Sequence, residues 1–220
     1  MPETAAPPDP RTVLHERTRP ITVDEYHKMG KAGLFAHDER VELLGGHLIT
    51  MSPVGYQHFY CINRLNMLIT RRIFEANVAE EPTVSVQGPV RLNSLSEPEP
   101  DLAVLSPDAP ETRMPTPHEV LLLIEVAHSS IDYDDGPKRI LYAEADIPVY
   151  WIVDVENETV DVLTAPDGGA YTKRRSFERG DAVPLPDTLP GEPIPVDDIL
   201  GVPADDSSTD EPQSDAGETV

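Results

Sequence analysis

The chain has 220 residues and a formal charge of −23, from 40 acidic and 17 basic side chains. This length favours one domain with a core of its own. Residues 197–220 hold eight of the acids and no Lys or Arg, but residues 21–196 still carry 29 acidic and 14 basic side chains, a net of −15. Such a body excludes strong long-range attraction to a polyanion, so nucleic-acid binding would need a local basic patch or a bound divalent cation.

No apolar stretch reaches the roughly 18 residues that a membrane helix requires, and the N-terminus has no basic region followed by an apolar one. We therefore expect a cytoplasmic protein without membrane contact. The single cysteine, Cys61, has no Cys or His neighbour at zinc-ligand spacing, so we expect a small buried apolar residue. Residues 1–20 and 197–220 have too few apolar side chains to offset the entropy of ordering. We therefore expect both segments to be disordered, on either side of one domain that covers residues 21–196.

The first predicted elements are a short helix, a hairpin and a long helix. Thr22 opens a Thr-x-x-Glu pattern, which predicts a capped helix start. A Gly-Gly pair between two apolar stretches predicts a hairpin over residues 40–51, because glycines supply the positive φ angles of a tight turn. From residue 56 to about 75, apolar residues recur at three- and four-residue steps, which indicates an amphipathic helix. Its polar face carries three arginines, for which we expect solvent exposure: Arg64, Arg71 and Arg72.

The second half predicts buried strands around one more helix. Residues 101–105 and 119–127 are almost continuously apolar, which is typical of strands covered on both faces. A proline at position 137 predicts the start of a helix that reaches about residue 146. These elements predict an α/β fold with a central mixed sheet flanked by helices. The remaining predicted strands cover 83–92, interrupted by a Gly-Pro pair, and 149–154, 159–163 and 171–177.

One carboxylate stands inside the most apolar stretch of the chain. Glu125 has six apolar neighbours within residues 121–127, and a buried ionised carboxylate requires a partner, a metal or a proton. Asp101 opens a similar apolar run, and Lys138 follows Glu125 by thirteen residues. Acids on neighbouring strands can project to one side, and a lysine on the following helix can reach back over them. Phosphodiester hydrolysis with Mg²⁺ needs such groups, namely metal ligands and a group that orients or deprotonates water.

Three segments resemble the Uma-two family of restriction-endonuclease-like proteins, formerly a domain of unknown function, within the PD-(D/E)XK nuclease superfamily. They are ELLGGHLITMSP, PEPDLAVLSPD and LLIEVAHSSIDYDDGPKRILYAEADIPVYWIVD. The resemblance covers roughly residues 20–185. It implies a restriction-endonuclease-like α/β core, Mg²⁺ or Mn²⁺ as cofactor and DNA as substrate, and it leaves a homodimer open.

The resemblance assigns roles by position. Asp101 matches the first metal-binding acid, Glu125 the second, and Lys138 the catalytic lysine. The superfamily's usual lysine position is Ala127, whose methyl group can do no proton chemistry, and a lysine from the next helix is expected to fill that space. Glu42 matches an upstream acid that can bind metal through water.

One further position matches the family, and two depart from it. His58 matches a histidine near the start of the long helix. By its spacing, Asp134 stands four residues before Lys138 and can pair with it or shape the turn into the helix. Val149 stands where the family often has Glu, which would weaken activity if that acid belongs to the site. His128 replaces a frequent acid and makes the surroundings of Glu125 less negative.

Other interpretations remain open at this point. Glu125 can be a structural acid paired with a basic residue, Asp101 can cap a loop, and alternation in the hairpin can place Glu42 in solvent. His58 can be an ordinary surface histidine, and Tyr150 and Trp151 are most simply sheet core. The main functional alternative is a catalytically inactive binding module with a nuclease fold. A glycosidase pair of carboxylates ranks lower, because it leaves the lysine without a task and aromatic residues make up only 5% of the chain.

Overall fold

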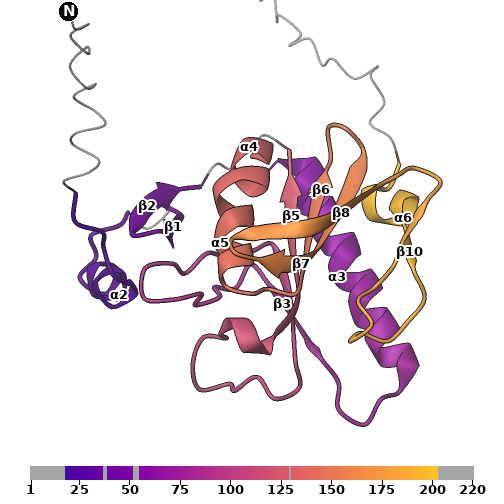
Figure 1. Cartoon of the computed structure of the whole chain (residues 1–220), viewed down its shortest axis with the longest axis horizontal. Helices are drawn as coiled ribbons and strands as arrows, with labels where there is room; N and C mark the ends of the chain where they lie inside the picture. The colour runs from indigo at the N-terminus through magenta and orange to yellow at the C-terminus, as the bar shows by residue number, and fades with distance from the viewer. Residues whose placement is uncertain (1–17, 37–38, 52–54, 129, 203–220) are drawn as a thin grey trace, which may run out of the picture.

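A six-stranded sheet forms the centre of the protein in our computed structural model, which describes residues 18–36, 39–51, 55–128 and 130–202. Its strand order is β3-β4-β5-β6-β7-β8, and only β5 and β6 pair in parallel. The predicted mixed sheet is thus confirmed (Figure 1). The strands are β3 (Thr83–Val86), β4 (Leu102–Leu105), β5 (Val120–Ala127), β6 (Val149–Asp154), β7 (Thr159–Asp167) and β8 (Ala170–Glu178).

Each face of the sheet is covered by helices, which explains the continuous apolar runs. Leu122, Ile124 and Val126 of β5 pack with α3 (Tyr56–Ala76) and α6 (Val196–Leu200) in one hydrophobic cluster. Leu123 and Ala127 point to the other face, where they pack with α5 (Arg139–Glu144). Side chains alternate between faces along a strand, so Glu125 projects to the α5 face.

The first helix and the hairpin of the described chain lie together on one side of the sheet (Figure 1). Thr22 and Glu25 form the predicted capping box of α2 (Val23–Lys31). The hairpin β1 (Val41–Leu44) and β2 (His47–Thr50) turns at two glycines with positive φ. At Gly46 a Cβ atom would lie 2.3 Å from the Pro20 ring, so only glycine fits.

The predicted long helix is present as α3, and two of its arginines form hydrogen bonds within the protein, outside the cleft described below. Arg71 donates to Glu75 at 2.6 Å, while Arg64 donates at 3.0 Å to the backbone carbonyl of Leu200. Neither side chain lines the cleft described below. Cys61 is buried and free, as predicted.

The helix predicted to begin at Pro137 is present, and a kink precedes it. The chain runs through α4 (Ile131–Tyr133) and η2 (Asp134–Lys138) into α5, but Gly136 within η2 has non-helical angles, with φ −115° and ψ −109°. Pro137 therefore stands at the start of the segment after the kink, where its missing N–H donor and fixed φ are tolerated. The predicted strand over 83–92 is shorter than expected, since β3 ends at Val86.

The predicted tail begins too early. The boundary at residue 197 falls inside α6, whose Val196, Ile199 and Leu200 are buried in the core. Acidic residues on the outer side hid these three apolar anchors in the sequence. Two short strands precede this helix, β9 (Ala182–Val183) and β10 (Ile194–Pro195). Residues 1–17 and 203–220, on which the rest of the predictions for the two ends fall, lie outside the described residues.

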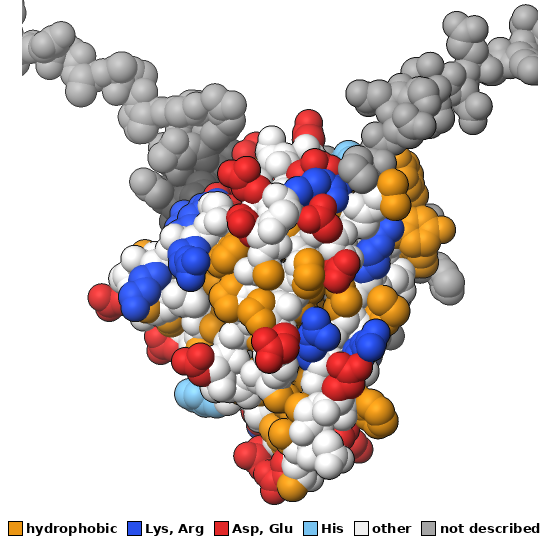
Figure 2. Space-filling view, turned by 90° about the vertical axis from the view of Figure 1, so that its right-hand side faces the viewer, with side chains coloured by type: hydrophobic (Ala, Val, Ile, Leu, Met, Phe, Trp, Pro, Cys, Tyr) orange, Lys and Arg blue, Asp and Glu red, His pale blue; other side chains and the backbone are white. Residues whose placement is uncertain are grey.

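Charges of both signs are mixed on the face that carries α3 and α6. Figure 2 shows Lys and Arg side chains there scattered among Asp and Glu, without a continuous basic stripe on this face. No helix within the described ranges is both long and apolar enough to cross a membrane.

Candidate active site

A cleft of about 420 Å³ gathers all five of the predicted site residues. Its wall is formed by residues from the β1–β2 hairpin, the start of α3, the β4 and β5 region and the α4–η2 segment. Each of the five residues comes from a different part of the chain: Glu42, His58, Asp101, Glu125 and Lys138.

Asp101 lies immediately before β4, and its carboxylate is held on several sides. Oδ2 accepts a hydrogen bond from the backbone N–H of Val126 at 2.9 Å and lies 3.0 Å from Nε2 of His58. Oδ1 accepts from the Gln87 side chain at 3.3 Å. These contacts fix the orientation of a carboxylate that is only 6% exposed, and they make His58 a support for Asp101.

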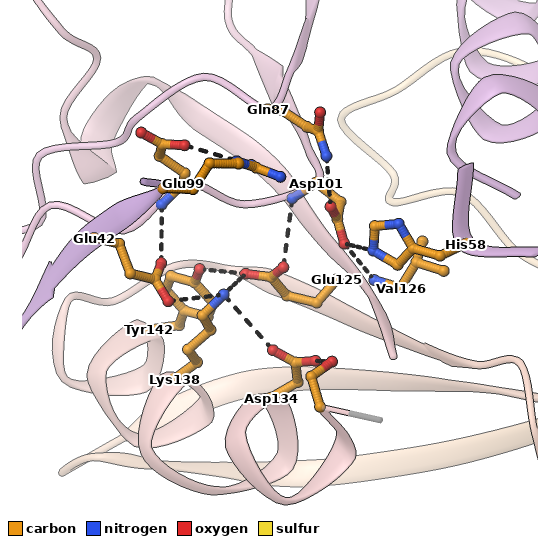
Figure 3. A network of polar contacts seen from close by, with 12 residues as sticks. Glu42, His58, Gln87, Glu99, Asp101, Glu125, Val126, Asp134, Lys138 and Tyr142 are labelled. Carbon is orange, nitrogen blue, oxygen red and sulfur yellow. Dashed lines mark hydrogen bonds and ion pairs between the residues drawn. The ribbon is translucent and has the colours of Figure 1, made fainter. Parts of the chain in front are cut away.

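Glu125 is nearly inaccessible, and three donors surround it (Figure 3). Oε1 accepts from Lys138 Nζ at 3.1 Å and from the Tyr142 hydroxyl at 2.7 Å, while the Asp101 N–H lies 3.4 Å from Oε2. Burial raises the pKa of Glu125 well above its ordinary value. The Lys138 ammonium opposes this rise, and the neighbouring carboxylates add to it.

Lys138 supplies the one ammonium group at the centre of this cluster. Its Nζ lies 3.1 Å from Glu125, 3.4 Å from Glu42 and 3.7 Å from Asp134 (Figure 3). Burial works to lower the pKa of Lys138, but the three carboxylates outweigh it and the pKa is raised. The predicted Asp134–Lys138 pair is therefore present within a larger ion cluster.

Glu42 faces the cleft, and the solvent alternative for it was wrong. All four residues of β1 are buried, and Glu42 is 2% exposed. Its Oε2 accepts from the backbone N–H of Glu99 at 3.2 Å. Burial raises the pKa of both Glu42 and Asp134, and Lys138 opposes the rise in each case.

Sequence reasoning missed Tyr142, Gln87 and Arg40. Tyr142 stands four residues after Lys138, so helical spacing alone could have placed the two side chains on one face. Gln87 and Arg40 carried no such signal, because they reach the site only through the packing of β3 and the hairpin. Arg40 lines the cleft and pairs with Glu99 at 3.6 Å.

The two departures from the family pattern differ in their relation to the cleft. Val149 packs against the cluster on the α3 face of the sheet, opposite Glu125, and is not part of the cleft wall. An acid at this position would therefore not join the ion cluster. His128 does line the cleft, where Nε2 lies 3.0 Å from the Gln57 side-chain oxygen.

The donor chemistry of the cleft fits a hard divalent cation. Glu42, Glu125 and Asp134 surround a single ammonium, so the buried acids outnumber the buried cation. Mg²⁺ typically binds through one or two carboxylates and keeps its other positions for water and phosphate, which Asp101 and Glu125 can satisfy. Among the described residues, no three His, Cys, Asp or Glu side chains are grouped to hold a metal by themselves.

Comparisons with known proteins agree with this fold. A crystal structure of a putative nuclease belonging to DUF820 from Anabaena variabilis superposes with a TM-score of 0.64 and 17% sequence identity, covering 82% of this chain and 98% of that one. A search of curated proteins found no match. A family model, described as putative restriction endonuclease, matches residues 23–197. Because this match spans most of the chain, the protein belongs to the Uma2 family.

Proposed function

We propose that this protein is a Mg²⁺-dependent endonuclease that hydrolyses phosphodiester bonds in DNA. The observation that carries the proposal is the convergence of Asp101, Glu125 and Lys138 from separate elements into one cleft. Family membership supports a nuclease-like function, and the putative nuclease with the same fold is consistent with it. A glycosidase interpretation leaves the buried ammonium without a role.

The proposed site residues have two roles, which are to bind the cation and to stabilise charge on the phosphate. Asp101 and Glu125 would hold the cation, which when bound polarises a phosphoryl oxygen and lowers the pKa of water. The Val126 N–H and His58 keep Asp101 oriented. The three neighbouring carboxylates outweigh burial and raise the pKa of Lys138 in the metal-free protein, which favours its protonated form. As an ammonium it would stabilise the charge that develops on the phosphate.

The test is metal-dependent cleavage of supercoiled plasmid and of a linear duplex, with Mg²⁺, Mn²⁺ or EDTA. Asp101→Asn and Lys138→Met should lower the rate by roughly 100-fold or more. Lys173→Met is the matched control, because Lys173 is exposed on β8 away from the cleft, and it should cleave like wild type. Thermal melts establish that each variant is folded.

Two outcomes would contradict the proposal. Equal cleavage by all variants would show a contaminating nuclease. Absence of cleavage of DNA and RNA by a folded wild-type protein would instead favour a binding module that retains the nuclease fold.

A further inference from the structure

A second pocket, of about 290 Å³, lies between α2 and the segment that precedes β4. Tyr26, Gly30 and Phe35 form its apolar side. Its polar lining has groups of both signs: Glu97, Glu99, His27 and Lys31. None of the catalytic residues proposed above lines it. It is therefore distinct from the catalytic cleft.

Glu97 is a buried acid with half of its carboxylate unused. Its side chain is 2% exposed, and Oε1 lies 2.5 Å from Nε2 of His27. The other oxygen, Oε2, is buried and has no hydrogen-bond partner among the described residues. Buried carboxylate oxygens are almost always hydrogen-bonded, so an unpartnered oxygen on a residue that lines a pocket is consistent with a ligand that supplies the missing donor.

The apolar side suits a flat ligand. The rings of Tyr26 and Phe35 lie 5.6 Å apart, inclined at 46°, and the Tyr26 hydroxyl is already engaged with the carbonyl of Val41. Gly30 leaves the space beside Phe35 open, since a Cβ there would meet that ring at an ordinary 3.9 Å. An aromatic surface beside a buried acceptor is how unpaired bases are commonly held.

Contacts of Glu99 connect the pocket to the catalytic cleft. Glu99 lines the pocket and pairs with Arg40, which lines the cleft. The backbone N–H of Glu99 also donates to Glu42 inside the cleft (Figure 3). A strand whose phosphate lies in the cleft therefore has the second pocket within its immediate surroundings.

We propose that this second pocket binds an unpaired nucleobase that carries an exocyclic amino group. The inference rests on the proposed nuclease function, because the base belongs to the strand being cleaved. The amino group of cytosine, adenine or guanine donates to Oε2 of Glu97, and the ring lies against Phe35 and Tyr26. Thymine is disfavoured, because its one ring N–H stands between two carbonyl oxygens that the carboxylate repels.

Calorimetric titration of the full chain with deoxycytidine and thymidine tests the proposal without any cleavage. These probes carry no phosphate, so the acidic surface does not repel them. We expect deoxycytidine to bind about five- to tenfold more tightly than thymidine. Glu97→Gln should remove this preference, because an amide offers both a donor and an acceptor.

Gly30→Leu provides an independent arm that leaves Glu97 in place. Leucine is a better helix former than glycine and has room for its Cβ, so the variant should fold while its side chain fills the pocket and abolishes binding. Ala32→Leu is the matched control, since Ala32 is exposed and does not line the pocket.

Three results overturn the proposal: equal affinity for the two nucleosides, unchanged binding in Gly30→Leu, or free arginine binding more tightly than deoxycytidine. The last would mark a pocket for cationic side chains. Nucleoside preference without DNA cleavage would refute the nuclease function alone, whereas cleavage without the preference would refute the base pocket alone.

Discussion

At the scale of single residues, the charge balance around Lys138 dominates the site. Its ammonium lies within 4 Å of three carboxylates, and all four groups are buried. Breaking a buried ion pair is costly, because the remaining charges lose their compensation. Here one cation compensates several acids. Removing the cation should therefore lower the stability of the metal-free protein, and removing one acid should raise it.

Lys138→Met should destabilise the metal-free protein by roughly 3–5 kcal/mol at pH 8. The raised pKa values of Glu125, Glu42 and Asp134 mean that these acids take up protons as the pH falls toward their ordinary values. The loss should therefore be smaller at pH 5. Chemical denaturation at both pH values measures it, with Lys173→Met as the control. A loss that does not change with pH would contradict this picture of the cluster.

Glu125→Gln should have the opposite effect without metal. A group whose pKa is raised by folding contributes its stability below its ordinary pKa and loses it as the pH rises through the folded value. The amide keeps an oxygen for Tyr142 but carries no charge. We expect similar stability at pH 4.5 and a melting temperature about 2 °C or more above wild type at pH 8, together with weaker Mg²⁺ affinity. A large loss of stability would instead identify a structural ion pair.

At the scale of elements, a kink at Gly136 separates the two short helical segments that carry Asp134 and Lys138. Gly136 has non-helical backbone angles, and both Asp134 and Lys138 are buried on either side of it. Pro137 begins the segment after the kink, as prolines often do at helix starts. Lys138 follows directly, and its ammonium reaches Glu125 on β5.

The C-terminal helix α6 is the other element that local sequence concealed. Its apolar side packs on α3 and closes that face of the core. Only three of its five residues are apolar, and the acids around them made the segment look like part of the tail.

Truncation should separate this helix from the chain beyond it. Ending the chain after residue 195 exposes the surface that Val196, Ile199 and Leu200 cover, and should cost several kcal/mol at roughly 1.5–3 kcal/mol for each buried side chain. Ending it after residue 203 should leave the melting temperature nearly unchanged, because the remaining residues are mostly polar or acidic. Equal melting temperatures for the two truncations would contradict the assigned role of α6.

At the scale of the whole molecule, the net negative charge of the protein disfavours binding of the proposed DNA substrate. The net charge of −15 over residues 21–196 repels a polyanion, and the face in Figure 2 offers no continuous basic surface. A divalent cation between the carboxylates and the phosphate would reverse the local field. A homodimer remains a prediction, which light scattering of the purified chain would decide.

DNA affinity should therefore depend on divalent cations beyond their contribution to ionic strength. We expect Mg²⁺ to tighten duplex binding about tenfold or more, equivalent to roughly 1.4 kcal/mol, relative to KCl at equal ionic strength. Fluorescence anisotropy measures this, and electrophoresis afterwards verifies that the duplex is intact. Glu125→Gln should lose most of the gain. Tighter binding in KCl than in Mg²⁺ would argue against a shared metal.

The sequence by itself determined the elements and the chemistry of the central residues. Capping, glycine pairs and apolar periodicity act over a few residues, so the α2 start, the hairpin and α3 were predictable. The cost of burying Glu125 made it a candidate, and the family resemblance pointed to Asp101 and Lys138. Only the tertiary structure decided that Glu42 faces inward, that Val149 lies on the other face, and that Gln87 and Arg40 reach the cleft. These outcomes depend on strand order and register, which bring together side chains that no local pattern relates.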